Sequence, residues 1–164
     1  MKTLLFLLFL IIGKYTFQQP DILYINDQEV QLRFIFPLEK LNFNKRPFGY
    51  TRETAPTSAC WRGYTANWTI IDKKLYLKSI NRCYGDDNKP HTLDLSTFFQ
   101  SNNLDYDLEN DLIFANWFTG ELPIKSEHGE LYLNSNKSTK TILNKDSDIA
   151  NIRKGIVIGY RTPK

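Results

Sequence analysis

The chain has 164 residues and a formal net charge of only +3, from 21 Lys and Arg against 18 Asp and Glu. Its basic residues are scattered among acidic ones, and Lys45-Arg46 and Arg153-Lys154 are isolated pairs, which excludes the basic stripe expected of a nucleic-acid-binding protein. Residues 20–164 are enough for a single domain with an adequate hydrophobic core, and no Pro/Gly/Ser linker divides them.

Residues 1–19 are predicted to be a secretory signal peptide. Lys2 supplies a positive charge, and residues 4–12 are an unbroken apolar run followed by Gly13. The run is too short to cross the roughly 30 Å hydrocarbon core of a bilayer, and it fits the apolar region of a signal peptide. We therefore expect an exported protein, periplasmic or secreted, with no stable membrane insertion once this segment is removed. An apolar first strand of a cytosolic domain is the alternative, which the lack of alternation disfavours.

The next segment is expected to open the fold with a β-hairpin. Residues 22–25 form its first strand, Asn26-Asp27 its turn and residues 29–36 its second strand, which Pro37 ends. Residues 38–59, with several Pro, Gly, Asn, Thr and Ser, are expected to be an extended surface loop.

A central hairpin gives the clearest pattern, because a two-residue turn at Asp72-Lys73 places apolar side chains of both strands on one face. Asp tolerates the positive φ that a tight hairpin turn requires. Tyr64, Ala66, Trp68 and Ile70 then share the core face. The predicted cross-strand pairs are Ile71 with Lys74, Ile70 with Leu75, Thr69 with Tyr76, Trp68 with Leu77, and Asn67 with Lys78.

Two cysteines, Cys60 and Cys83, flank this hairpin and are predicted to form a disulfide. In the predicted register they are diagonal neighbours, a separation somewhat too long for a relaxed bridge unless strand twist or a bulge closes the gap. An oxidising compartment favours the bond, which would stabilise the fold by roughly 3 kcal/mol. Two buried free thiols are the alternative. Neither cysteine has a His–carboxylate set nearby in the sequence, so neither is predicted to be a nucleophile.

The remaining chain is predicted to hold one short helix and several strands. Residues 85–90 read as a turn, and Asp94 or Ser96 could cap a helix through Phe98 and Phe99. Further strands are predicted at residues 112–122 (ended by Pro123), 130–133, 140–143, 149–152 and 155–161. The fold class is therefore all-β or strand-dominated α+β, as an antiparallel sandwich or an open barrel with at most one or two short helices.

Several segments resemble an uncharacterised family of small bacterial proteins. They are residues 25–30 (INDQEV), 36–39 (FPLE), 45–47 (KRP), 61–66 (WRGYTA), 74–77 (KLYL), 114–120 (FANWFTG) and 154–157 (KGIV). The resemblance covers most of the chain after residue 20, although Asn116 stands where the family often has an acidic residue and the C-terminal third matches loosely. It implies a common fold and a bacterial origin, and it carries no established activity.

Aromatic residues are the feature most able to bind a ligand. Trp68 is assigned to the core, whereas Trp61 and Tyr76 fall on the opposite face, where Trp61 could stack on a sugar ring or a partner surface. Arg62 is expected at the strand entrance, reaching a sheet edge or a buried carboxylate such as Glu39. The candidate binding residues are Trp61, Arg62, Tyr64, Tyr76 and Trp117. For Trp61 and Trp117, packing beneath other elements is the competing interpretation.

No catalytic or metal-binding signature accompanies these residues. His91 and His128 lack neighbouring ligands, and the acidic run at residues 105–111 lacks the Gly and distal Glu of a helix–loop–helix calcium site. We expect no cofactor and no metal, and the balance of the sequence is against an enzyme. The predicted function is an exported β-domain that binds a protein partner, as an accessory or toxin-neutralising protein. The alternatives are a carbohydrate-binding module and a hydrolase whose carboxylates pair only in space.

Overall fold

The computed structural model describes residues 18–26, 28–51, 53–55, 57–84, 91–124 and 149–161. Four features predicted above lie outside the described residues: most of the signal segment (residues 1–17), the turn at residues 85–90, the strands at residues 130–133 and 140–143, and His128. Within the described ranges, no helix has the length and apolar character needed to span a bilayer.

Strands dominate the described fold. They are β1 (Asp21–Ile25), β2 (Gln28–Leu32), β3 (Tyr64–Ile71), β4 (Lys74–Arg82), β5 (Thr92–Leu93), β6 (Leu108–Glu109), β7 (Leu112–Phe114), β8 (Gly120–Pro123), β9 (Ile149–Arg153) and β10 (Ile156–Arg161). One α-helix, α1 (Leu95–Ser101), and three 3₁₀ turns, η1 (Pro37–Lys40), η2 (Pro47–Gly49) and η3 (Ser58–Cys60), complete the elements. The predicted strand-dominated class is confirmed.

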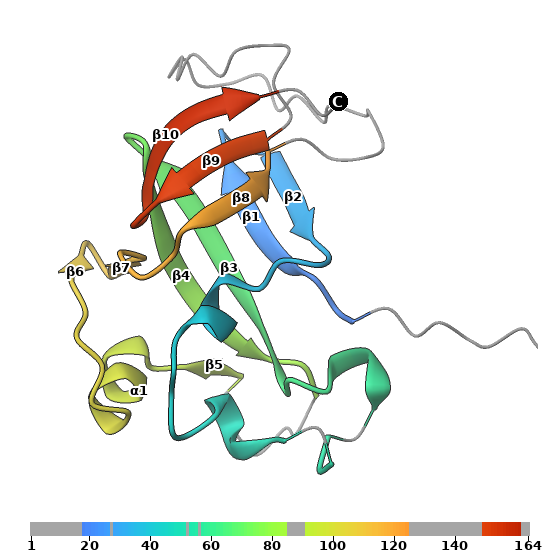
Figure 1. Ribbon diagram of the computed structural model, residues 1–164. Helices are drawn as coiled ribbons and strands as arrows, with labels where there is room; N and C mark the ends of the chain where they lie inside the picture. The colour runs from blue at the N-terminus through green and yellow to red at the C-terminus, as the bar shows by residue number, and fades with distance from the viewer. Residues whose placement is uncertain are drawn as a thin grey trace, which may run out of the picture.

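The strands form one curved sheet in the order β2-β1-β3-β4-β10-β9-β8 (Figure 1). The first and last strands of this order, β2 and β8, come into contact, so the sheet is nearly closed and barrel-like. β1 and β3 run parallel, whereas the other neighbouring strands are antiparallel, which makes the sheet mixed. β2 returns along β1, and residues 33–63 then join the end of β2 to the start of β3 on the other side of β1.

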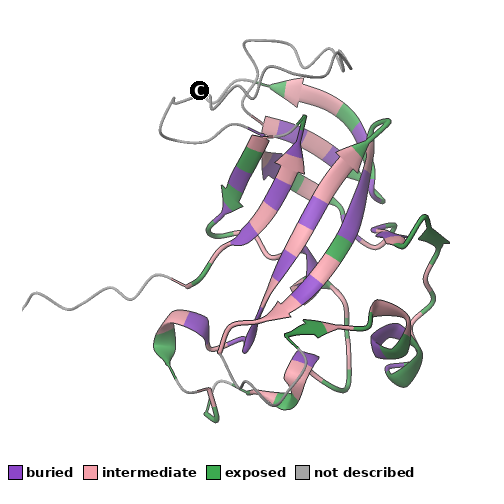
Figure 2. Cartoon of the chain, turned by 180° about the vertical axis from the view of Figure 1, so that it is seen from behind, coloured by how far each residue is buried: buried purple, intermediate pink, exposed green. Residues whose placement is uncertain are grey.

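The register of the central hairpin is confirmed from its turn to Trp68. Ile71 faces Lys74 and Trp68 faces Leu77, and the turn residues Asp72 and Lys73 have φ of 48° and 63°. These two positive values define the tight primed turn that matches strand twist. Buried and half-buried residues alternate from Tyr64 to Thr69, as the face count predicted, whereas Ile70 is only half-buried (Figure 2).

Beyond Trp68 the predicted register is wrong, because Asn67 faces Ser79 instead of Lys78. A β-bulge at this point adds one residue to β4. Strict alternation after Leu77 would have turned Ser79 toward the core, and the extra residue brings Ile80 inward in its place. Ile80 is fully buried.

Cys60 and Cys83 form the predicted disulfide, with Cα atoms 6.4 Å apart. Cys60 ends the η3 turn, and its carbonyl accepts a hydrogen bond from Gly63 N–H at 3.0 Å. Cys83 follows β4 and donates its N–H to Gly63 O at 3.3 Å. Cys60 therefore reaches Cys83 by folding back in a turn, and not as the diagonal neighbour on an extended strand that the register had implied.

Two predicted strands are shorter than expected. β2 ends at Leu32, because residues 33–36 leave the sheet and lead into η1, which begins at Pro37. The predicted strand 112–122 is divided into β7 and β8. Between β7 and β8, the backbone hydrogen bonds do not belong to a regular β-ladder. Ala115 N–H donates to Leu75 O at 2.9 Å, and Phe118 O accepts from Gly155 N–H at 2.8 Å.

The helix and the last hairpin follow the prediction. Asp94 caps α1, where its carboxylate accepts from Thr97 N–H at 2.7 Å. α1 buries Phe98 and Phe99 against the core. β9 and β10 form a hairpin whose turn residues Lys154 and Gly155 have φ of 47° and 76°.

Trp68 lies at the centre of the core with no exposed surface. Its indole packs edge-on against Trp117, with ring centroids 6.4 Å apart. We expect Trp68→Ala to lower the free energy of unfolding by about 3–5 kcal/mol, because it removes a large buried aromatic ring. Trp61→Ala is the matched control, since the half-buried Trp61 lies outside the sheet. Urea unfolding followed by circular dichroism measures both, and equal small losses would contradict this assignment of the core.

The disulfide gives a second stability prediction. It joins residues separated by 23 positions, so the Cys60→Ser/Cys83→Ser double variant should lose about 3 kcal/mol through the larger entropy of its unfolded chain. Urea unfolding of the double variant against the oxidised wild type measures this loss. In the oxidised protein neither cysteine should react with a thiol reagent before reduction. Labelling of both cysteines in the native, unreduced protein would contradict the bond.

Candidate functional site

A fully buried ion pair lies where β1 and β3 begin. Arg62 Nη1 donates to Asp21 Oδ1 at 2.9 Å, and neither side chain has exposed surface. Asp21 also accepts from Ala66 N–H at 3.0 Å and from Trp68 Nε1 at 3.2 Å. The predicted buried carboxylate partner of Arg62 is therefore Asp21, and the assignment to Glu39 is wrong. Burial raises the pKa of Asp21 above its usual value, while the charge of Arg62 and the bonds from Ala66 and Trp68 act in the opposite direction.

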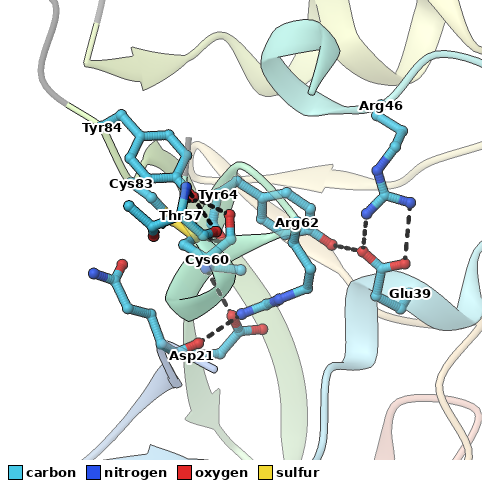
Figure 3. The surroundings of a disulfide bond; sticks show 11 residues. Asp21, Glu39, Arg46, Thr57, Cys60, Arg62, Tyr64, Cys83 and Tyr84 are labelled. Atoms are coloured by element: carbon cyan, nitrogen blue, oxygen red, sulfur yellow. Dashed lines mark hydrogen bonds and ion pairs between the residues drawn. A yellow bond between two sulfur atoms is a disulfide. The ribbon is translucent and has the colours of Figure 1, made fainter. Parts of the chain in front are cut away.

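Glu39 belongs to a second polar group close to this pair. Tyr64 OH donates to Glu39 Oε1 at 2.6 Å, and Arg46 Nη2 donates to the same oxygen at 2.7 Å (Figure 3). Burial, followed by the charge of Glu39, raises the pKa of Tyr64 well above its usual value, so the phenol stays protonated and donates. The Arg46 guanidinium also lies 5.5 Å from the centre of the Trp61 ring.

The Asp21–Arg62 pair and the Tyr64–Glu39–Arg46 group both contact one short stretch of chain, residues 34–40. The Arg62 guanidinium lies 3.8 Å from the centre of the Phe36 ring, and Glu39 is bound as described. A third contact comes from Trp117, whose Nε1 donates to Pro37 O at 3.1 Å. The 34–40 segment is thus fixed at three successive points by side chains from distant parts of the sequence.

The outer side of the 34–40 segment is a shallow hollow. Its volume is about 260 Å³, and it is lined by Phe34, Ile35, Phe36, Glu39 and Lys40. Phe34 is 75% exposed, the largest exposed fraction among the exposed large hydrophobic side chains of the described chain. This apolar hollow, in a segment fixed by the three contacts above, is the candidate functional site.

The residues predicted to bind a ligand act mainly as the support of this site. Four of the five, Trp61, Arg62, Tyr64 and Trp117, lie beneath the 34–40 segment or contact a residue that holds it. Arg62 and Tyr64 have no exposed surface, and Trp61 and Trp117 are half-buried. The fifth lies elsewhere and is buried: Tyr76 on β4 donates its OH to Glu109 Oε2 at 2.7 Å.

Sequence reasoning missed the residues that form the hollow and part of its support, namely Phe34, Ile35, Phe36, Lys40 and Arg46. The available signal was the apolar run of residues 34–36 just before Pro37. That run was assigned to the second strand of the opening hairpin, although a strand with one solvated face should alternate.

The described residues contain no group of three or more His, Cys, Asp and Glu placed to hold a metal ion. The acidic run at residues 105–111 builds a hairpin, in which Asn110 and Asp111 form the β6–β7 turn with φ of 51° and 63°. His91 is exposed. The arrangement offers apolar contact and hydrogen bonding, and it does not bring together an evident nucleophile and base.

No protein-family model matches the chain, and neither a curated protein nor a solved structure matches it. The resemblance to the uncharacterised bacterial family therefore stays a prediction. The candidate site depends on the geometry of this chain alone.

The buried ion pair predicts a large and asymmetric mutational effect. Asp21→Asn leaves the charge of Arg62 buried and uncompensated, so the free energy of unfolding should fall by about 3–5 kcal/mol. Replacing both partners, as Asp21→Asn with Arg62→Met, removes the stranded charge and should recover part of this loss. Urea unfolding of the three proteins measures the effect. A double variant no more stable than Asp21→Asn alone would contradict the stranded-charge explanation.

Proposed function

We propose that this chain is an exported, non-enzymatic β-domain that binds a protein partner through the hollow of the 34–40 segment. The observation that supports it is an exposed Phe34 at an apolar hollow, in a segment that contacts from Arg62, Trp117 and Tyr64 hold in place. Rigid presentation favours binding, because little conformational entropy is lost when a partner docks.

The lining of the hollow indicates the chemistry of the partner. A volume of about 260 Å³ can take one large apolar side chain, against Phe34, Ile35 and Phe36. Glu39 is already neutralised by Arg46, so Lys40 supplies the positive charge at the edge of the hollow. We therefore expect the partner to insert an aromatic or aliphatic residue that has an acidic residue close by.

Export is part of the proposal and has two supports. The disulfide between Cys60 and Cys83 is typical of oxidising compartments. The N-terminal apolar run preceded by Lys2 fits a signal peptide. Gln19 N–H donates to Ala59 O, and Gln19 O accepts from Arg62 Nη2 at 2.9 Å. We therefore expect cleavage upstream of Gln19, which makes the signal segment shorter than the predicted residues 1–19.

The carbohydrate-binding alternative gains less support. It requires aromatic ring faces open to a sugar, and two of the candidate aromatic residues, Tyr64 and Tyr76, are buried. The half-buried Trp61 ring lies against the Arg46 guanidinium, and the Trp117 ring packs on Phe99 with centroids 5.6 Å apart. The hollow, whose exposed aromatic residue is Phe34, suits a protein side chain better than a polar sugar.

Site-specific photo-crosslinking in the exporting cell tests this function. A photoreactive phenylalanine analogue at position 34 should give one discrete adduct with a partner protein, because the probe replaces an exposed ring at the hollow. The same analogue at Leu108, which is 50% exposed, is the matched control and should give none. Adding Lys40→Glu should weaken the adduct at position 34, since it reverses the charge offered to an acidic partner. No adduct at position 34, or equal adducts at both positions, would reject the proposal.

A further inference from the structure

A lateral row of isoleucine and cationic side chains crosses four neighbouring strands. Lys74 of β4 faces Ile71 of β3 on one side and Ile156 of β10 on the other. Ile156 in turn faces Arg153 of β9. Residues that face each other across neighbouring strands project from the same side of the sheet, so apolar and positively charged side chains alternate along this row.

The row lies on the outer, convex side of the curved sheet (Figure 1). The residues next to it along the strands, Leu75, Ile152 and Val157, are buried in the core. Successive side chains of a strand point to opposite faces of the sheet, so the row points away from the core.

Three isoleucines form the apolar part of this surface, which we call the isoleucine face. Ile71, Ile156 and Ile158 are 46%, 46% and 61% exposed, and they are three of the five exposed large hydrophobic side chains of the described chain. Ile158 lies two residues beyond Ile156 on β10, within the bulge between Val157 and Gly159. A group of exposed apolar side chains on one face indicates contact with another molecule or with lipid.

Two hairpin turns meet beside the isoleucine face. In the β3–β4 turn, Lys73 O accepts from Val157 N–H at 2.7 Å. In the β9–β10 turn, Gly155 O accepts from Leu75 N–H at 2.8 Å. The two turns are therefore held next to each other by backbone hydrogen bonds.

These turns carry an excess of positive charge. Lys73, Arg153 and Lys154 are exposed, and within the part of the chain that the structure describes none of them forms an ion pair. Asp72 is the one acidic residue at these two turns. The isoleucine face is thus bordered by cations whose charge is not neutralised by a neighbour.

We propose that the isoleucine face attaches the domain to the surface of an anionic membrane, with the isoleucines at the boundary between lipid headgroups and acyl chains. Isoleucine side chains are stabilised by leaving water, and Lys and Arg beside them contact lipid phosphate. Each such cation near an anionic bilayer strengthens binding roughly fivefold. Lys74 is already paired with Glu109, so this contribution comes from the turns and from Arg153.

Shape and charge favour lipid over a second copy of the chain. Two rigid convex faces touch over a small area only, whereas lipid headgroups adjust to a convex surface. Two copies would also bring together the unpaired cations Lys73, Arg153 and Lys154 of each chain. An anionic surface complements these charges. The inference rests on export, which is part of the proposed function, because an exported chain meets the outer surface of the membrane that it has crossed, but it does not require partner binding at the hollow.

Flotation of the purified exported protein with lipid vesicles tests this attachment. Vesicles of phosphatidylcholine and phosphatidylglycerol in equal parts should bind the wild type at least tenfold more tightly than vesicles of phosphatidylcholine alone, and high salt should weaken the binding. Ile158→Ser and Lys154→Glu should each weaken binding to the anionic vesicles at least tenfold, with circular dichroism spectra like that of the wild type.

Phe34→Ser is the matched control, since it removes an exposed apolar side chain at the hollow. It should float as the wild type does while partner binding is lost, which separates failure of the membrane contact from failure of the proposed function. No binding to the anionic vesicles would overturn the inference and leave the isoleucine face to a protein partner. Equal binding of the wild type, Ile158→Ser and Lys154→Glu would also overturn it.

A tryptophan introduced into the isoleucine face locates the contact. In vesicles whose lipids carry bromine on the acyl chains, Ile158→Trp should lose more of its fluorescence than the wild type does, because its indole comes close to the quenching bromine. Phe34→Trp is the control and should add no quenching beyond that of the wild type. Equal quenching of the two variants, or none added by Ile158→Trp, would count against this face as the membrane contact.

Discussion

The Asp21–Arg62 ion pair is the interaction on which the rest of the structure depends. It joins the start of β1 to the residues just before β3, and the same carboxylate accepts from the backbone of Ala66 and the indole of Trp68. Two charges buried without these additional bonds would be costly to remove from water. Together they fix β1 beside β3 in parallel, a pairing that no local turn could impose.

That pairing also determines where the 34–40 segment lies. Because β3 enters on the far side of β1 from β2, the chain between β2 and β3 must cross the end of the sheet. Its first part then passes over Arg62 and Tyr64, which bind Phe36 and Glu39. The buried ion pair therefore lies on one side of the 34–40 segment and the exposed hollow on the other. A substitution in the ion pair should alter the hollow before it unfolds the sheet.

Local features of this fold could be predicted from sequence, and non-local ones could not. The central hairpin was predictable because a two-residue turn and a period of two fix its register from neighbouring residues alone. The bulge at Lys78 was missed. Its signal was the spacing of two apolar residues, because Leu77 and Ile80 are three positions apart and strict alternation would place them on opposite faces. The partner of Arg62 was mistaken because Asp21 lies 41 positions away and reaches it only through the parallel pairing. Four of the predicted binding residues are near the candidate site, where they support the 34–40 segment and do not line the hollow. Residue type alone does not reveal which side of this segment is exposed.

The two cysteines have a consequence for how the protein matures. A chain with only two cysteines allows one intramolecular pairing, so oxidation within a single chain cannot produce a wrong isomer. The partners are brought together by a turn and a hairpin that form from nearby residues, so the thiols should meet before the distant strands dock. Maturation should therefore require a thiol oxidase but no disulfide isomerase.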